Sequence, residues 1–297
     1  MPSNARRLGW WALGLAVALL GLYVALPQVA GLDETWGRLR DGDPWWLAAA
    51  AAFEACSYGG YVVAFRGILT RDGERIGWRE TYDITMAGVA ATRLLATAGA
   101  GGIALTAWAL TRSGMERLEV ASRLTTFYVV LYGIYMIALV VVGVGLHSGV
   151  LGGPSPFGLT VVPAAFAGAA IVAALALLGR RDVALAGALA WWAFDVAVLW
   201  ACLHAFGEPP ALGVVVMAYF TGMLANTLPL PGGIGGVEGG MIGALIAFGV
   251  AGGLAIVAVL SYRAFAFWLP TVPGAISYLR LRREVSEWDG DRSAVPS

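Results

Sequence analysis

Apolar residues form six continuous runs along the chain, each long enough to cross a lipid bilayer. A transmembrane helix needs about 20 predominantly apolar residues. The runs cover residues 8–26, 45–65, 124–146, 161–178, 183–206 and 254–279. We expect each run to form a membrane-spanning helix. The first run is longer than the roughly 7–15 apolar residues of a cleaved signal peptide, so we expect it to be retained.

Two further apolar segments are interrupted near their middle. Glycine residues break the segment 81–111 at positions 99–102, and the sequence PLPGGIGG breaks the segment 211–250 at positions 229–236. Proline cannot donate a backbone hydrogen bond, and glycine allows sharp reversals of the chain. Both segments are therefore predicted to contain broken helices rather than one straight span.

The distribution of arginine predicts how the first interrupted segment meets the membrane. Short cytoplasmic loops are enriched in arginine and lysine. Arginines stand on both sides of the segment 81–111, at positions 66, 71, 75 and 79 before it and at 112, 117 and 123 after it. Its 31 residues are too few for two complete crossings. We therefore predict a re-entrant hairpin that opens toward the cytoplasm.

The second interrupted segment is predicted to open toward the opposite side. The run 183–206 leads to an outer loop containing Glu208, and the last run returns to Arg280, Arg282 and Arg283. The segment 211–250 must then begin and end outside, as a hairpin or a pair of short helices. Such oppositely oriented halves are typical of transporters that bind their substrate at the repeat interface.

The predicted architecture is therefore an all-α polytopic membrane protein built from two inverted repeats, each with three transmembrane helices and a re-entrant or broken-helix hairpin. The repeats cover about 8–146 and 161–279, within a single transmembrane domain at 1–283. Residues 284–297 are expected to form a short, disordered cytoplasmic tail.

Composition agrees with a membrane protein and excludes other classes. Hydrophobic residues make up 59% of the chain and charged residues only 13%, against about 25% charged in ordinary globular domains. The net charge is zero, so no nucleic acid partner is expected. Two cysteines and two histidines give no metal-ligand spacing. We therefore expect no metal or cofactor.

Five ionisable residues stand inside apolar segments: Glu54, Arg93, Asp195, Glu238 and Arg263. Each charge costs about 2.5–3.5 kcal/mol at the bilayer centre on insertion scales, so pairing or hydration is required. Asp195–Arg263 and Glu238–Arg263 are candidate pairs in the second repeat, and Glu54–Arg93 in the first. Two interpretations stay open. The pairs could fix helix register, or they could line a polar pathway that contacts a lipid head group or carries a proton.

The proline- and glycine-rich interruption is the second candidate site. Free backbone N–H groups there, and at the start of the following helix, could bind an anion such as a lipid phosphate. A purely structural hairpin tip is the alternative. The candidate residues at this tip and beside it are Asn226, Pro229, Pro231, Gly232, Gly233, Gly235, Gly236 and Glu238.

The stretch NTLPLPGGIGGVEGG at 226–240 resembles the Pro-x-Pro-Gly-Gly-x-Gly-x-x-Glu signature of the lysylphosphatidylglycerol synthase transmembrane (flippase-like) domain family. Arg263 with Leu269 and Pro270, and the basic end at 280–283, also look like that family. Many members carry proline and a Gly-Glu pair in the first hairpin. The sequence AGAGGIALTA at 98–107 departs from that pattern.

The resemblance implies a protein of a prokaryotic cytoplasmic membrane, with both termini cytoplasmic, that moves a phospholipid or lipid-linked head group between leaflets. Its implied partner is a membrane lipid with an anionic or lipid-linked head group, bound between the two hairpins. Only 14 residues follow Arg283, so we expect a stand-alone member without aminoacyl transfer, and not an enzyme. The alternatives are an intramembrane lipid-modifying enzyme and an accessory subunit of a lipid or glycolipid pathway.

Overall fold

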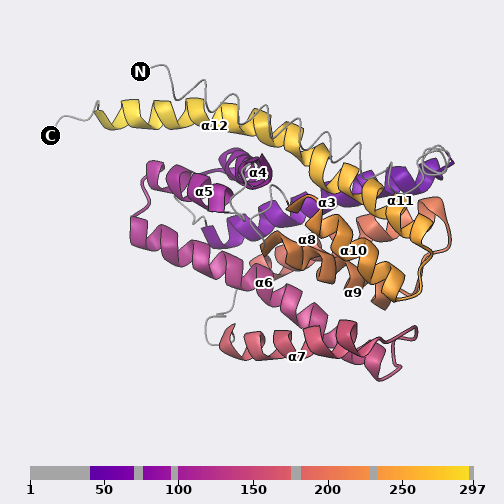
Figure 1. Ribbon diagram of the computed structural model, residues 1–297. Coiled ribbons are helices and arrows are strands. Elements are labelled where there is room, and N and C mark those ends of the chain that lie inside the picture. Colours follow the sequence, from indigo (N-terminus) through magenta and orange to yellow (C-terminus); the bar gives the residue numbers. More distant parts are fainter. Residues whose placement is uncertain (1–40, 70–75, 95–99, 175–181, 228–232, 294–297) are drawn as a thin grey trace, which may run out of the picture. The chain divides into compact units, whose positions relative to one another are not determined.

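The computed structural model describes residues 41–69, 76–94, 100–174, 182–227 and 233–293 (Figure 1). All but the first two of these residues belong to one compact unit, Asp43–Ser297. Within the described residues, the regular elements are all helical. They are α3 (Pro44–Leu69), α4 (Trp78–Leu94), α5 (Ala100–Arg112), α6 (Arg117–His147), α7 (Phe157–Ala174), α8 (Asp182–Phe206), α9 (Leu212–Met223), η2 (Leu224–Thr227), α10 (Gly236–Ala247), α11 (Gly252–Arg263), η4 (Ala264–Trp268) and α12 (Leu269–Ser293).

In the part of the chain that the structure describes, four helices are long and apolar enough to cross a membrane: Pro44–Leu69, Arg117–His147, Val183–Phe206 and Gly252–Val285. They confirm the predictions for 45–65, 124–146, 183–206 and 254–279. The predicted span at 161–178 corresponds to α7, and the predicted first helix at 8–26 lies outside the described residues. The last helix is longer than expected. α12 continues to Ser293, into the segment that was predicted as a disordered tail.

Each interrupted segment contains two short helices that pack against each other. We call α4 with α5 the first helix pair, and α9 with η2 and α10 the second. A Cβ atom on Gly240 would lie 2.9 Å from the Cα of Gly222, and one on Gly102 would overlap Thr92 and the backbone of Gly88. Both pairs therefore use glycine to bring two helix backbones into contact.

The first helix pair begins and ends at the same end of the unit. Arg79 at the start of α4 lies 3.9 Å from Glu284 of α12, and Arg123 near the start of α6 donates to the Leu69 carbonyl at the end of α3. Buried contacts join Leu110, Val120 and Leu281 in the same core cluster. Arg79, Arg123 and the part of α12 around Leu281 and Glu284 thus lie at one end, which we call the basic end.

The second helix pair begins and ends at the opposite end. There the Asp43 N–H donates to the Ala205 carbonyl, which joins the start of α3 to the end of α8. A Cβ on Gly207 would touch Leu254, and one on Gly213 would touch Leu146. The start of α9, the end of α6 and the start of α11 therefore lie together, away from the basic end.

Helices α3 and α8 form the antiparallel centre of the unit and make the most extensive contact in it (Figure 1). A Cβ on Gly60 would lie 2.7 Å from the Gly187 carbonyl oxygen, and a Cβ on Gly187 would lie 2.7 Å from the Gly60 oxygen. The Ser57 hydroxyl donates to the Trp191 carbonyl at 2.9 Å. This reciprocal approach sets the two helices side by side at the depth of Glu54 and Asp195.

Candidate functional site

Glu238 joins the second helix pair to α11. It occupies the third position of α10, and one carboxylate oxygen accepts the Gly235 N–H at 2.7 Å. The other oxygen accepts Arg263 Nε at 2.6 Å, and both side chains are about nine-tenths buried. The predicted Glu238–Arg263 pair is confirmed. The residue that caps the start of α10 therefore also forms a buried ion pair.

The tip of the second helix pair has a backbone that only glycine adopts easily. Gly233 and Gly235 have φ angles of +68° and +83°. A side chain at Gly233 would also collide with the Asn226 amide, whose nitrogen lies 3.3 Å from the Met223 sulfur. Gly236 begins α10. Pro229, Pro231 and Gly232 lie outside the described residues.

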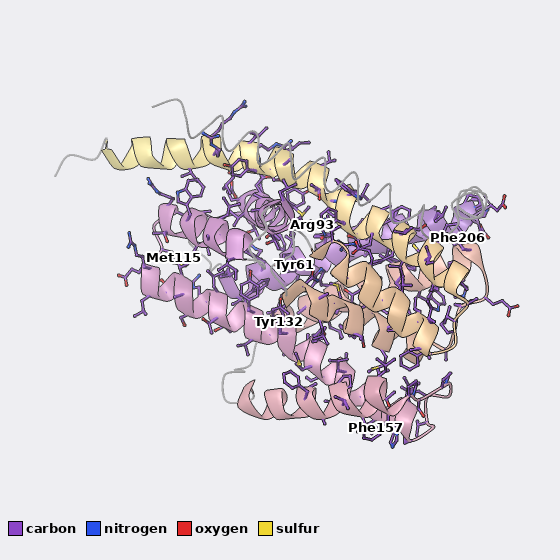
Figure 2. All side chains as sticks on the ribbon, viewed as in Figure 1. Tyr61, Arg93, Met115, Tyr132, Phe157 and Phe206 are labelled. Carbon is purple, nitrogen blue, oxygen red and sulfur yellow. The ribbon has the colours of Figure 1, made fainter. Side chains whose placement is uncertain are left out.

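Arg93, near the end of α4, reaches across to the junction of α11 and α12 (Figure 2). Its guanidinium donates to the Phe267 carbonyl at 2.6 Å, to the Ala266 carbonyl and to the Tyr58 hydroxyl of α3. Pro270 explains why a carbonyl is free there. Proline has no N–H, so Ala266 cannot complete the usual helical bond to residue 270. Both carbonyls that Arg93 binds belong to the π-helical turn η4, and the Phe267 carbonyl also accepts the Thr271 hydroxyl.

Phe267 brings the partly buried Arg93 and the buried Arg263 to one ring. The guanidinium carbon of Arg93 lies 5.4 Å from the ring centroid, and that of Arg263 lies 4.7 Å from it. Both distances allow a cation–π contact. Arg93 comes from the first helix pair, whereas Arg263 carries the ion pair to the second. The residues predicted separately in the two repeats are therefore neighbours.

The remaining two acids lie at the crossing of α3 and α8. Asp195 is 6% exposed and accepts the Tyr219 hydroxyl at 2.5 Å with one oxygen, while its other oxygen has no partner within the described residues. Glu54 is 2% exposed, and neither of its oxygens accepts a hydrogen bond in the described part of the chain. Glu54 interacts electrostatically with Asp195 and Arg93, and Asp195 with Arg93 and Arg263.

Two of the expected pairs need correction. A direct Glu54–Arg93 pair does not form, because Arg93 donates to Tyr58 and to backbone carbonyls instead. Asp195 takes a hydrogen bond from Tyr219 and meets Arg263 through longer-range electrostatics. Sequence reasoning did not foresee the tyrosines as partners, because aromatic residues in apolar runs are most simply interpreted as packing or interfacial anchors.

Asp83 is a buried acid that sequence reasoning missed. It lies in α4, it is 0% exposed, and neither carboxylate oxygen has a partner within the described residues. α4 packs on α12, where the Ser277 hydroxyl is also buried without a partner. The available signal was an acidic residue within an apolar segment, the same criterion that selected Glu54.

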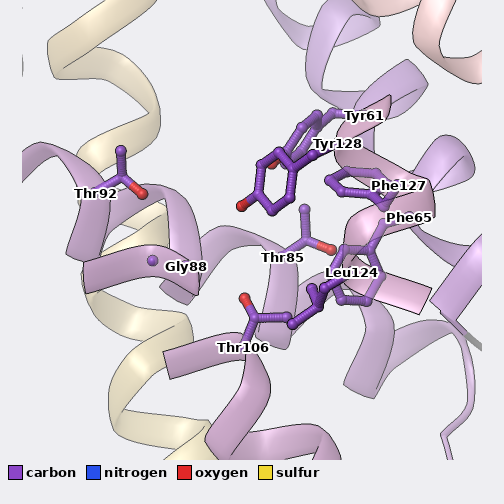
Figure 3. Close-up of a pocket in the computed structure, with 10 residues that line it drawn as sticks. Tyr61, Phe65, Thr85, Gly88, Thr92, Thr106, Leu124, Phe127 and Tyr128 are labelled. Atoms are coloured by element: carbon purple, nitrogen blue, oxygen red, sulfur yellow. The ribbon is translucent and has the colours of Figure 1, made fainter. Parts of the chain in front are cut away.

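The first helix pair borders a narrow pocket with a hydroxyl-rich lining (Figure 3). Tyr61 and Tyr128 stand on one side of it, and Thr85, Thr92 and Thr106 come from the helix pair itself. None of its lining residues is charged. The first helix pair therefore presents hydroxyl groups at this pocket, in agreement with a sequence at 98–107 that departs from the Gly-Glu pattern of many family members.

Comparison with known proteins finds a family similarity in the second half of the chain. Residues 183–274 match the family model described as the lysylphosphatidylglycerol synthase TM region. This range contains Asp195, Glu238 and Arg263. It therefore includes the ion pair and the α3-facing acid of α8.

Two curated relatives are UPF0104 membrane proteins of the archaeon Methanothermobacter thermautotrophicus. One is 35% identical over 86 residues, which are 29% of this chain and 26% of the relative. The other is 31% identical over 100 residues, which are 33% of this chain and 28% of the relative. The matched segment thus spans about a quarter of the length of these relatives. The chain is a membrane protein whose residues 183–274 are similar to the lysylphosphatidylglycerol synthase TM region.

Proposed function

We propose that this protein moves a phospholipid or another lipid with an anionic head group between the leaflets of the membrane. The observation that carries the proposal is the meeting of Arg93 and Arg263 on the Phe267 ring. Each arginine is associated with a different helix pair. The head group is proposed to bind between the two pairs, at these guanidinium groups.

Guanidinium chemistry supports a phosphate-bearing head group. Arginine presents a planar fork of donors that matches two oxygens of a phosphate. Buried charges in membrane proteins mark substrate pathways far more often than anchors, because their insertion is costly. In this structure, Arg263 is bound to the Glu238 carboxylate. An arriving phosphate would compete with this carboxylate for the same donors.

The arrangement of the two helix pairs supports alternating access. The first pair opens at the basic end and the second at the opposite end. α4 packs on α12, the last helix of the second half, and α9 packs on α6, the last helix of the first half. This reciprocal pattern is what two inverted repeats with re-entrant hairpins would give.

The gathered arginines support a cytoplasmic location for the basic end. By the positive-inside rule, the loops flanking the first helix pair and the C-terminal half of α12 would face the cytoplasm of a prokaryotic cell. The N-terminus would face the same side if 8–26 crosses the membrane once.

A flipping assay in proteoliposomes tests the proposal. Fluorescent phosphatidylglycerol would be placed in both leaflets, and the fraction protected from an external quencher would be followed over time. We expect the wild type to expose the inner pool rapidly and Glu238→Gln and Arg263→Ala to lose this activity. Glu208→Gln, which changes an exposed acid, is the matched control.

Normal flipping by both site variants would overturn the assignment of this site. Absence of flipping by the wild type with phosphatidylglycerol, and with the lipid that copurifies in mild detergent, would overturn the transport function itself.

A further inference from the structure

We propose that Glu54 and Asp195 share one proton at rest, and that uptake of a second proton by this pair is coupled to movement of the anionic lipid. The coupling rests on the proposed function, whereas the proton site stands on the geometry alone. The first observation is the burial of Glu54, which is only 2% exposed. Neither of its carboxylate oxygens has a hydrogen-bond partner in the described structure.

The two carboxyl groups lie at the same depth on adjacent helices. Phe53 and Phe194, the residues directly before Glu54 and Asp195, place their rings 6.0 Å apart. Ser57 binds the Trp191 carbonyl about one turn further along. Two carboxylates that share one buried site cannot both be ionised without a large penalty, so the pair holds a proton between them.

Neither Arg93 nor Arg263 forms an ion pair with Glu54 or Asp195, because both arginines bind other groups. Arg93 from α4 is engaged by Tyr58 and two carbonyls, and Arg263 from α11 is bound by Glu238. Tyr219 from α9 donates to Asp195. The other ionisable groups that interact with the pair are Tyr262 of α11, Cys202 of α8 and Tyr58 of α3, and η4 contributes no ionisable side chain.

Charge balance suggests how loading is linked to the lipid. Three carboxyl groups (Glu54, Asp195, Glu238) interact with the two guanidinium groups of Arg93 and Arg263 in the described structure. With one proton on the acid pair, this group is neutral. A bound phosphate adds a negative charge in a poorly hydrated place, and a second proton on the pair would restore neutrality.

The proposed step forms and breaks only O–H bonds. A proton from water on one side binds a carboxylate oxygen of the pair as the anionic head group binds the arginines. The proton then leaves to water on the other side when the head group is released. Among the described residues, no three histidine, cysteine or acidic side chains stand close enough to hold a metal ion. A proton therefore fits this site better than a metal cation.

Infrared spectroscopy of the purified full chain tests the proton site directly. The carboxylic acid band at neutral pH would be compared between the wild type and the double variant Glu54→Gln/Asp195→Asn, and calibrated against fully acidified protein. The double variant removes two carboxyl groups. We expect it to lose the intensity of one acid. Loss of two, or of none, would overturn the shared proton.

Asp83→Asn and Glu208→Gln are controls in the same measurement. Asp83 is another buried acid on a different helix, and Glu208 is exposed. Neither substitution should change the loss caused by the double variant. Circular dichroism would establish that each variant keeps the wild-type helix content, and Glu54→Gln alone serves if the double variant does not fold.

A proton gradient across proteoliposomes tests the coupling. We expect wild-type flipping of fluorescent phosphatidylglycerol to change several-fold when the gradient is imposed, and flipping by the double variant to ignore it. Gradient-independent flipping by the wild type would overturn the coupling. If the wild type flips no lipid under either condition, the proposed function fails, but the infrared result still decides the proton site.

Discussion

Glu238 binds Arg263 at 2.6 Å with one carboxylate oxygen and caps α10 with the other. One side chain therefore fixes the start of a helix and neutralises a buried cation. The two roles are coupled, because Glu238 bonds to both Arg263 and the Gly235 N–H. A ligand that separates Arg263 from Glu238 would therefore also loosen the start of α10. This relation makes the pair a structural element as well as the proposed lipid site.

Stability measurements can separate these two roles. Arg263→Gln leaves Glu238 buried without its cation, which should destabilise the protein by about 3–5 kcal/mol. The double variant Glu238→Gln/Arg263→Gln removes both charges and should recover much of that loss. We expect unfolding in mixed detergent micelles to show this order, while lipid flipping stays absent in both variants. A double variant less stable than Arg263→Gln would contradict the ion-pair interpretation.

The glycine contact between α3 and α8 gives a second prediction. In Gly60→Ala, the new methyl group would lie 2.7 Å from backbone atoms of Gly187 and Trp191. The crossing would have to open, at a cost of about 1–3 kcal/mol. Gly59→Ala is the matched control because a Cβ there meets nothing within 4 Å. It should be neutral or stabilising by up to about 1 kcal/mol. Equal unfolding midpoints for the two variants would count against the close approach.

The tip of the second helix pair yields a third prediction. Gly235→Ala places a side chain at a φ of +83°, which costs about 1–2 kcal/mol, and disturbs the N–H that Glu238 accepts. Gly239→Ala, one turn further along α10 in open space, should not destabilise the protein. The unfolding temperature and the rate of lipid flipping should both decline in Gly235→Ala and stay unchanged in Gly239→Ala. An unaffected Gly235→Ala protein would show that this backbone geometry is not required.

Cysteine accessibility tests the membrane topology. In a background without Cys56 and Cys202, Arg79→Cys and Ser113→Cys flank the first helix pair, whereas Glu208→Cys and Ala251→Cys flank the second. An impermeant maleimide added to intact cells should label only the latter two.

Permeabilised cells, in which all four cysteines should react, provide the control for this labelling. If the two cysteines that flank one helix pair react from different sides of the membrane, that pair is not re-entrant. Labelling of Arg79→Cys from outside would reverse the predicted orientation of the whole unit.

Much of the fold was predictable because membrane helices leave a strong local signal. The length of an apolar run reports bilayer thickness, so α3, α6 and α8 were found with small errors at their ends. The extension of α12 was not found, because its final turns are polar and carry no hydropathy signal. The broken segments were recognised from glycine and proline, which act through the backbone of their own neighbourhood.

The sequence identified the ionisable residues of the candidate site, but it did not identify most of their bonding partners. Glu54, Arg93, Asp195, Glu238 and Arg263 stood out because charge is costly in an apolar run. Their partners depend on contacts between helices, and two of the expected pairs were replaced by tyrosine and backbone groups. Asp83 carries the same signal, an acidic residue within an apolar segment, and it is fully buried.

The sequence by itself determined that the chain is a membrane protein, where its apolar segments are interrupted and that several ionisable residues stand inside them. These properties follow from composition and order along the chain. Only the tertiary structure decided that Arg93 bonds to the Ala266 and Phe267 carbonyls, that Phe267 joins both arginines, and that Glu54 and Asp195 lie at the same depth on adjacent helices. Those relations depend on which helices cross and at what depth, and no local pattern encodes the depth of a crossing.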